Sequence, residues 1–192
     1  MLISIMTMSC EEGTELSRAD NLFNRGEYGE AIDMYTEFLR LHPEHTKTLY
    51  NRGRAYEEMG EYEKALEDFN SVLKKDFTHV QANISVAKDY YFRQKDYHKA
   101  ITFLNTAIKH SPQNAIAYTL RGKAYQKLGE VDKALKEYNN ALSIDNTLGE
   151  AYYSRGSLWI YLRKKDKACS DFELAVSLGN TDASEAIKQY CK

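Results

Sequence analysis

An alanine that recurs at a nearly constant spacing constrains this chain more than any other feature of its sequence. Five such alanines are separated by 34, 35, 34 and 34 residues: Ala31, Ala65, Ala100, Ala134 and Ala168. A bulky apolar residue follows each of them after four positions, and a small or apolar residue follows after seven. Those offsets share one face of a helix. The period predicts stacked helical repeats, none of which buries its apolar face alone.

A second helical segment precedes each alanine, and a short turn separates the two segments. Gly26, Gly60 and Gly129 lie in these turns, where a glycine can take the left-handed conformation that ends a helix. Pro43 and Pro112 lie between successive repeats, where the second helix must stop. Each repeat is therefore predicted to be a helix, a tight turn and a second helix. The predicted fold class is all-α.

The spacing and the residue types resemble the tetratricopeptide repeat (TPR) family, in particular bacterial TPR proteins and lipoproteins with a C-terminal capping helix. Segments such as LYNRGRAYEEMGEYEKALEDFNSVLKKD and AYTLRGKAYQKLGEVDKALKEYNNALSID fit the family pattern at nearly every signature position. The resemblance implies a right-handed α-solenoid of five repeats. Their expected bounds, after an N-terminal segment 1–11 and before a capping helix 180–192, are 12–45, 46–80, 81–114, 115–148 and 149–179.

Two departures from the family pattern affect the expected packing. Ala19 and Lys88 stand where the first helix of a repeat usually has glycine. Arg52, Arg121 and Arg155 occupy a position that is often leucine. We expect the arginine stems to pack against the repeats while the guanidinium groups reach carboxylates.

A third departure is the spacing of 35 residues between Ala65 and Ala100. We place the extra residue before the third repeat, near Phe77, which replaces the usual proline. Stacking between the second and third repeats is therefore expected to be irregular.

The capping helix is expected to cover the apolar end of the solenoid. Thr181 or Asp182 is predicted to cap its N-terminus. Ala183, Ile187 and Tyr190 form its apolar stripe.

Cys169 and Cys191 lie eleven residues on either side of Asn180. They would stand at the same height if the capping helix folds back antiparallel. A disulfide between them is one interpretation, and two small buried thiols are the other. In the chain-entropy model, closing this loop would stabilise the fold by about 3 kcal/mol.

The N-terminal stretch Met1–Ser9 is apolar and ends at Cys10. It resembles the end of a bacterial lipoprotein signal, whose cysteine carries lipid. A basic start and a longer apolar run are missing from it. Two locations stay open: the bacterial cell envelope, through lipidation of Cys10, or the cytoplasm, with a frayed apolar N-terminus.

The resemblance also places a partner-binding groove on the first helices of the repeats. The residues carried over to this groove are Tyr50, Arg54, Asp89, Phe92, Arg93, Lys123, Lys127, Tyr153 and Tyr161. Arginine and aromatic side chains are frequent in protein-binding hot spots. We therefore expect a partner peptide or helix with acidic and apolar character. The alternative is a solvated face of mixed charge.

Some TPR proteins hold the C-termini of chaperones through a clamp of Lys, Asn and Arg side chains. Asn51 fits one clamp position, but the other positions hold Leu16, Asp20, Ala82 and Val86. A chaperone-tail receptor of that type is not expected.

No catalytic site, metal site or cofactor is predicted. The chain lacks a phosphate loop, a GxGxxG segment after a strand, an HExxH motif and a nucleophile elbow. His42 and His45 fit a solvated turn better than a metal site. A net charge of −2 without a basic stripe disfavours nucleic-acid binding, and no apolar run is long enough to span a membrane.

These observations predict a monomeric, non-catalytic scaffold that binds another protein. The alternative is a structural component that self-associates within a larger envelope assembly.

Overall fold

The computed structural model describes the backbone of residues 3–191 and the side chains of residues 14–191. This part of the chain forms α-helices and no strands, so the predicted all-α helical solenoid is confirmed. The helices are α1 (Ile3–Asn24), α2 (Tyr28–Leu41), α3 (Thr46–Glu58), α4 (Tyr62–Lys75), α5 (Val80–Phe92), α6 (Tyr97–His110), α7 (Ala115–Lys127), α8 (Val131–Ile144), α9 (Gly149–Tyr161), α10 (Lys165–Ser177) and α11 (Thr181–Tyr190). None of them is long and apolar enough to cross a membrane, as far as the described residues go.

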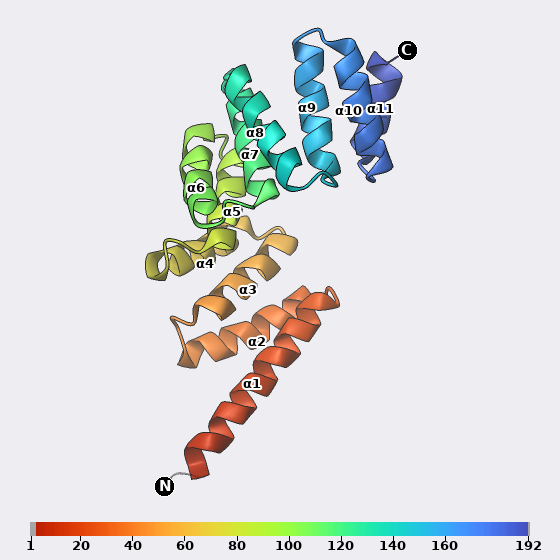
Figure 1. Ribbon diagram of the computed structural model, residues 1–192. Helices are drawn as coiled ribbons and strands as arrows, with labels where there is room; N and C mark the ends of the chain where they lie inside the picture. Colours follow the sequence, from red (N-terminus) through yellow and green to blue (C-terminus); the bar gives the residue numbers. More distant parts are fainter. Residues whose placement is uncertain (1–2, 192) are drawn as a thin grey trace. The chain divides into compact units, whose positions relative to one another are not determined.

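The chain divides into two compact bodies, Met1–Val86 and Ala87–Lys192, and the division falls within α5. In the N-terminal body, α1 packs on α2, α2 on α3, and α3 on α4. In the C-terminal body, the helices from α6 to α11 pack in the same sequential way, from α6 on α7 to α10 on α11. Figure 1 shows the two helices of a pair, such as α9 and α10, side by side and antiparallel.

Close approach of the paired helices depends on glycine in the first helix and an aromatic ring in the second. Gly122 of α7 lies over the ring of Tyr138 in α8, and a Cβ atom added at Gly122 would be 2.7 Å from Cε1 of that ring. Gly53 over Phe69 and Gly156 over Phe172 repeat this arrangement at the same distance. The rings are buried: Tyr138 is 0% exposed.

Three arginines of the first helices reach carboxylates, as predicted. The guanidinium groups of Arg52, Arg121 and Arg155 each form an ion pair, at 2.7 Å, with the second helix of the same repeat. The carboxylates are, in order, Asp68, Glu137 and Asp171. All three carboxylates are buried, so each pair fastens the two helices of its repeat together.

The same arginines also bind the preceding repeat. Their Nη1 atoms donate to the side-chain oxygens of Thr36, Asn105 and Asn139, at 3.1, 2.8 and 2.8 Å respectively. Each arginine therefore joins three helices and substitutes for the apolar contact that leucine would make at this position.

Glycine ends the first helix in most repeats, as predicted. Gly26, Gly60 and Gly129 have φ angles of 80°, 76° and 76°. Lys95 and Arg163 take the same left-handed conformation in the other two turns, with φ angles of 58° and 57°. A residue other than glycine is disfavoured in that conformation.

The predicted place of the extra residue is wrong. Four residues, Asp76 to His79, connect α4 to α5, as in the other connections between repeats. The extra residue lies in the turn between α5 and α6, which spans 93–96, whereas the turns within the other repeats have three residues. As a consequence, buried Ala87 takes the place of the first-helix glycine in the third repeat, and Lys88 is exposed.

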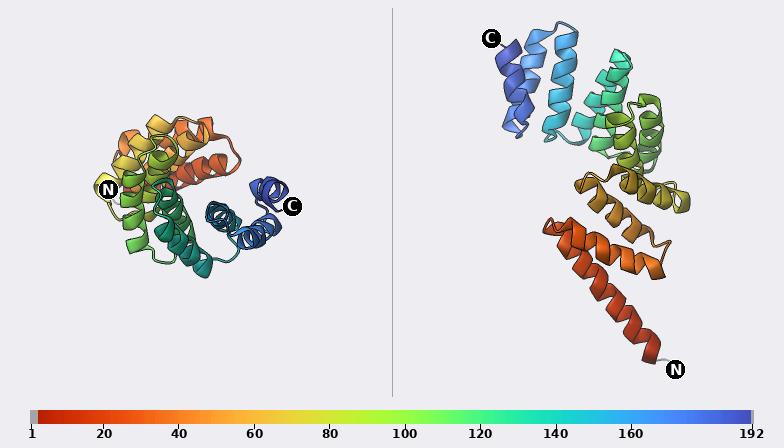
Figure 2. Two further views of the ribbon diagram at one scale, coloured as in Figure 1. Left: turned by 90° about the horizontal axis from the view of Figure 1, so that it is seen from above. Right: turned by 180° about the vertical axis from the view of Figure 1, so that it is seen from behind.

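The capping helix α11 packs against α10 and near α9, which Figure 2 also shows. Its N-cap is Asn180 rather than Thr181 or Asp182, because the Asn180 side chain accepts a hydrogen bond from the Ala183 amide at 3.0 Å. Two residues of α11, Ala183 and Ala186, are buried, whereas Tyr190 of the predicted apolar stripe remains 39% exposed.

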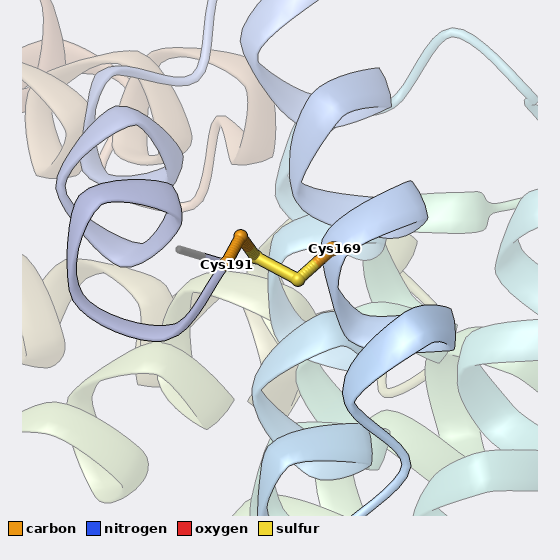
Figure 3. The surroundings of a disulfide bond; sticks show 2 residues. All are labelled: Cys169 and Cys191. Atoms are coloured by element: carbon orange, nitrogen blue, oxygen red, sulfur yellow. A yellow bond between two sulfur atoms is a disulfide. The ribbon is translucent and has the colours of Figure 1, made fainter.

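A disulfide joins Cys169 of α10 to Cys191 at the end of α11 (Figure 3). The two Cα atoms are 5.6 Å apart, and the closed loop has a sequence separation of 22 residues. The bond fastens the C-terminal end of the capping helix to the last repeat, whose core also contains Phe172 and Ala175.

Candidate partner-binding surface

In the N-terminal body, residues of the first helices α1 and α3 and Tyr35 of α2 line a small polar cavity of about 210 Å³. The carboxylate of Asp20 lines this cavity. It accepts hydrogen bonds from Oη of Tyr35 at 2.6 Å and from Nδ2 of Asn51 at 2.8 Å, and Nζ of Lys47 lies 3.3 Å away. Through these contacts the Asp20 carboxylate joins α1 to α2 and α3.

Two of the expected groove residues belong to this body. The Arg54 guanidinium lies 4.7 Å from the centre of the Phe23 ring, at the edge of the cavity. Tyr50 instead packs inward, with its ring centre 5.1 Å from that of His79 and 5.7 Å from that of Phe69. Burial raises the pKa of Tyr50. Of the two, Arg54 is the exposed one.

In the C-terminal body, Asp89 and Arg93 bind each other. Nε of Arg93 donates to Oδ1 of Asp89 at 2.6 Å, and Nε2 of Gln94 donates to Oδ2 of Asp89 at 2.6 Å. The Asp89 side chain is only 11% exposed. These contacts hold the turn after α5, which is one residue longer than the turns within the other repeats. Because of this longer turn, each position of α5 holds the residue that lies one earlier in the sequence than the alanine spacing predicts.

Phe92 and Lys123 come together on α5 and α7. Phe92 is 52% exposed, and Nζ of Lys123 lies 5.3 Å from the centre of its ring. Lys123 also pairs with Oε1 of Glu150 at 2.8 Å, and Oε2 of Glu150 accepts from Nδ2 of Asn180 at 3.3 Å. The positive charge of Lys123 is therefore largely balanced within the body.

Lys127 is exposed at the last position of α7. Tyr161, the last residue of α9, is 71% exposed. Both are open to a partner.

Tyr153 lines a second cavity, of about 350 Å³, between α9 and α11. Its ring centre is 5.9 Å from that of Phe172, which forms the floor. Asp182 and Glu185 of α11 line the opposite wall.

The sequence interpretation did not place these two acidic residues on a binding surface, because it treated α11 only as a cap and considered Asp182 only for the N-terminus of that helix. α11 has an asparagine N-cap that accepts from the third residue of the helix, as Asn114 does for α7. α11 follows the second helix α10 in the chain as α9 follows α8. Its second and fifth residues, Asp182 and Glu185, line the cavity as Tyr153, the fifth residue of α9, does.

The ionisable groups buried in the described part of the chain are used in structural contacts. No buried side-chain nitrogen or oxygen there lacks a hydrogen-bond partner, and no cluster of three or more His, Cys, Asp or Glu residues forms there. His45, one of the pair considered for a metal, accepts from the Thr48 amide and so caps α3.

Profiles of the tetratricopeptide repeat match residues 16–76 and 115–148, and a TPR repeat profile matches residues 89–129. Among curated proteins, BBSome complex member BBS4 of Bos taurus is 27% identical over 67% of this chain and 24% of its own length. Hsp70-Hsp90 organizing protein 1 of Glycine max is 31% identical over 50% of this chain and 17% of its own length. This chain thus spans about a quarter or less of these two relatives.

Among solved structures, a crystal structure of MamA is similar, with a TM-score of 0.73 and 26% identity over 86% of this chain and 96% of that one. The three profile matches together cover more than half of the sequence, and the described part of the chain consists of successive α-helices. The chain belongs to the tetratricopeptide-repeat family.

Proposed function

We propose that this chain is a non-catalytic scaffold that binds a segment of another protein on the first-helix faces of its repeats. The cavity between α9 and α11 carries the proposal, because it combines an apolar floor with charged and aromatic walls and lies on those faces. The relatives support a role in protein–protein interaction.

The buried carboxylates support a scaffold rather than an enzyme. Asp68, Glu137 and Asp171 are each held by an arginine. A general acid or base must instead be free to exchange a proton with a substrate.

A partner segment that carries both acidic and basic groups is better supported than the acidic partner expected from the sequence. Lys123 is paired with Glu150, and Arg93 with Asp89, so neither cation offers its full charge to a ligand. Of the cations predicted for the groove, Arg54 and Lys127 remain, and both are exposed.

The proposal is tested by using the full chain as bait in extracts of the native organism and identifying captured proteins by mass spectrometry. Replacing exposed first-helix residues, in the variants Arg54→Glu and Phe92→Glu, is expected to reduce capture of the partner by at least about tenfold. The matched controls are Lys74→Glu and Leu174→Glu, which change exposed residues of the second helices α4 and α10. Equal capture by all four variants would contradict the proposal.

Self-association is the second candidate, since Leu41, Phe77 and Tyr161 are exposed by 62%, 70% and 71%. Light scattering after size exclusion discriminates the two. A dimer that dissociates in Phe77→Glu or Tyr161→Glu supports the structural role, whereas a monomer at high concentration excludes it.

Membrane tethering through lipid on Cys10 is a separate proposal, and the side chain of Cys10 lies outside the described residues. Metabolic labelling with a fatty-acid analogue in a bacterial host tests it. Incorporation that is lost in Cys10→Ser supports tethering, and its absence in the unaltered chain contradicts it.

A further inference from the structure

The cavity between α9 and α11 has two unlike walls. Tyr153 and Ile160 of α9 give it an aromatic and aliphatic side. Phe172 of α10 forms a floor that is almost fully buried, at 1% exposure. Its volume of about 350 Å³ is enough for one long side chain of a ligand.

The opposite wall is acidic. Asp182 and Glu185 lie three residues apart on α11, so both face the cavity. Among the described residues that line it, none is basic. Lys188 contacts Glu185 at 3.1 Å, but both side chains are at least 66% exposed, and such exposed pairs contribute little. The two carboxylates are therefore not offset by a basic side chain among the described residues that line the cavity.

The acidic wall is held in place by the rest of the C-terminal body. The disulfide fastens the end of α11 to α10. At the start of α11, the Asn180 side chain caps the helix and also donates to Glu150 of α9. A wall fixed at both ends loses little conformational entropy when a ligand binds.

We infer that this cavity binds an arginine or lysine side chain of an extended or helical segment in the partner protein. The aliphatic stem of the ligand side chain lies on Ile160 and Phe172, and its cation faces Asp182 and Glu185 beside the ring of Tyr153. Arginine and lysine are the side chains that combine such a stem with a terminal charge, and a tyrosine face attracts that charge further. This inference rests on the proposed function and specifies the chemistry of the partner.

The test uses four short synthetic peptides with identical apolar residues that carry Arg, Lys, Gln or Glu at the same two central positions. Binding to the full chain is measured by fluorescence anisotropy. The Arg and Lys peptides are expected to bind about tenfold or more tightly than the Gln peptide, and the Glu peptide least tightly. Undetectable binding of all four peptides, or equal binding, overturns the inference.

Two double variants test whether the preference for basic peptides arises in this cavity. Asp182→Lys with Glu185→Lys is expected to reverse the order of the peptides, and Asp182→Asn with Glu185→Gln to remove the preference without reversing it. The control, Asp166→Lys with Glu173→Lys, makes the same change of net charge at exposed positions of α10 and should leave the order unchanged. Equal effects of the control and the reversal would mean that overall charge, not this cavity, selects the peptide.

The outcome is distinguishable from failure of the scaffold proposal. A partner that is lost in Phe92→Glu but retained in the Asp182→Lys, Glu185→Lys variant leaves the scaffold standing and overturns the inference. A second copy of the chain in the cavity would appear as a dimer that the reversal variant dissociates, and that result would also overturn it.

Discussion

Gly122 has the Tyr138 ring directly against it, so its missing side chain is a requirement of packing. A methyl group there would lie 2.7 Å from Cε1 of the ring. Tyr138 is fully buried, and its Oη donates to Oε1 of Gln126 at 2.6 Å. The ring therefore cannot move aside without losing a hydrogen bond.

The variant Gly122→Ala is expected to lower the free energy of unfolding by about 1–2 kcal/mol, because overpacking exceeds the gain in helix propensity. Chemical denaturation followed by circular dichroism measures it. Gly29→Ala is the control, since Gly29 also lies in a helix, α2, but has nothing within 4 Å of the added carbon. Gly29→Ala should leave stability unchanged or raise it, and equal losses in both variants would disprove the packing argument.

At the scale of the helices, the features that recur once in every repeat could be predicted from the sequence. The alanine, the facing aromatic and the arginine recur with the repeat, so the helix pairs and the arginine–carboxylate contacts followed from the sequence. The position of the extra residue did not, because the interval from Ala65 to Ala100 includes two connections and reports only their combined length. Within α5, Ala87 and Lys88 stand side by side, and burial alone shows which of them faces the second helix.

The capping helix shows a second limit. Asn180, Thr181 and Asp182 are all good N-cap residues, so composition does not select the one that starts α11. That choice sets which residues face α9, and the acidic wall of the cavity depends on it. The pairing of Cys169 with Cys191 depends likewise on how α11 packs.

At this element scale, removal of the disulfide is expected to loosen α11 before the rest of the chain. Closure of a loop with a sequence separation of 22 stabilises by about 3 kcal/mol in the chain-entropy model. In Cys169→Ser with Cys191→Ser, amide hydrogen exchange at Ala183 and Ile187 should accelerate strongly, while that in α7 changes little. Cys10→Ser controls for loss of a thiol. Unchanged protection of α11 in the double variant would mean that its apolar contacts suffice.

At the scale of the whole molecule, burial of tyrosine hydroxyls makes the fold sensitive to alkaline pH. Burial raises the pKa of Tyr138 and Tyr35 above the ordinary value near 10. The pKa of Tyr91 is raised to about 12, first by burial and then by the nearby Tyr97 and Glu150. Each of these hydroxyls keeps its proton to a higher pH in the folded state than in the unfolded chain.

The sign of the effect follows from this difference. Above pH 10 the unfolded chain has lost tyrosine protons that the folded protein retains, so the free energy of unfolding falls as pH rises. The stabilisation that each of these tyrosines contributes to the folded state is fully present below pH 10. For Tyr91, this stabilisation is lost between pH 10 and about pH 12. Each shifted tyrosine contributes a slope of up to about 1.4 kcal/mol per pH unit.

Denaturant titrations between pH 8 and 11.5, with tyrosinate absorbance recorded in parallel, measure this slope. Tyr138→Phe is expected to be less stable than the unaltered protein at pH 8, because the hydrogen bond to Gln126 is lost, yet to have a shallower decline above pH 10. Tyr161→Phe removes a hydroxyl from an exposed side chain and serves as the control. Lysines also titrate in this range, but they are the same in all three proteins, so the difference between slopes isolates the tyrosine. Identical slopes would show that the Tyr138 hydroxyl does not couple folding to pH.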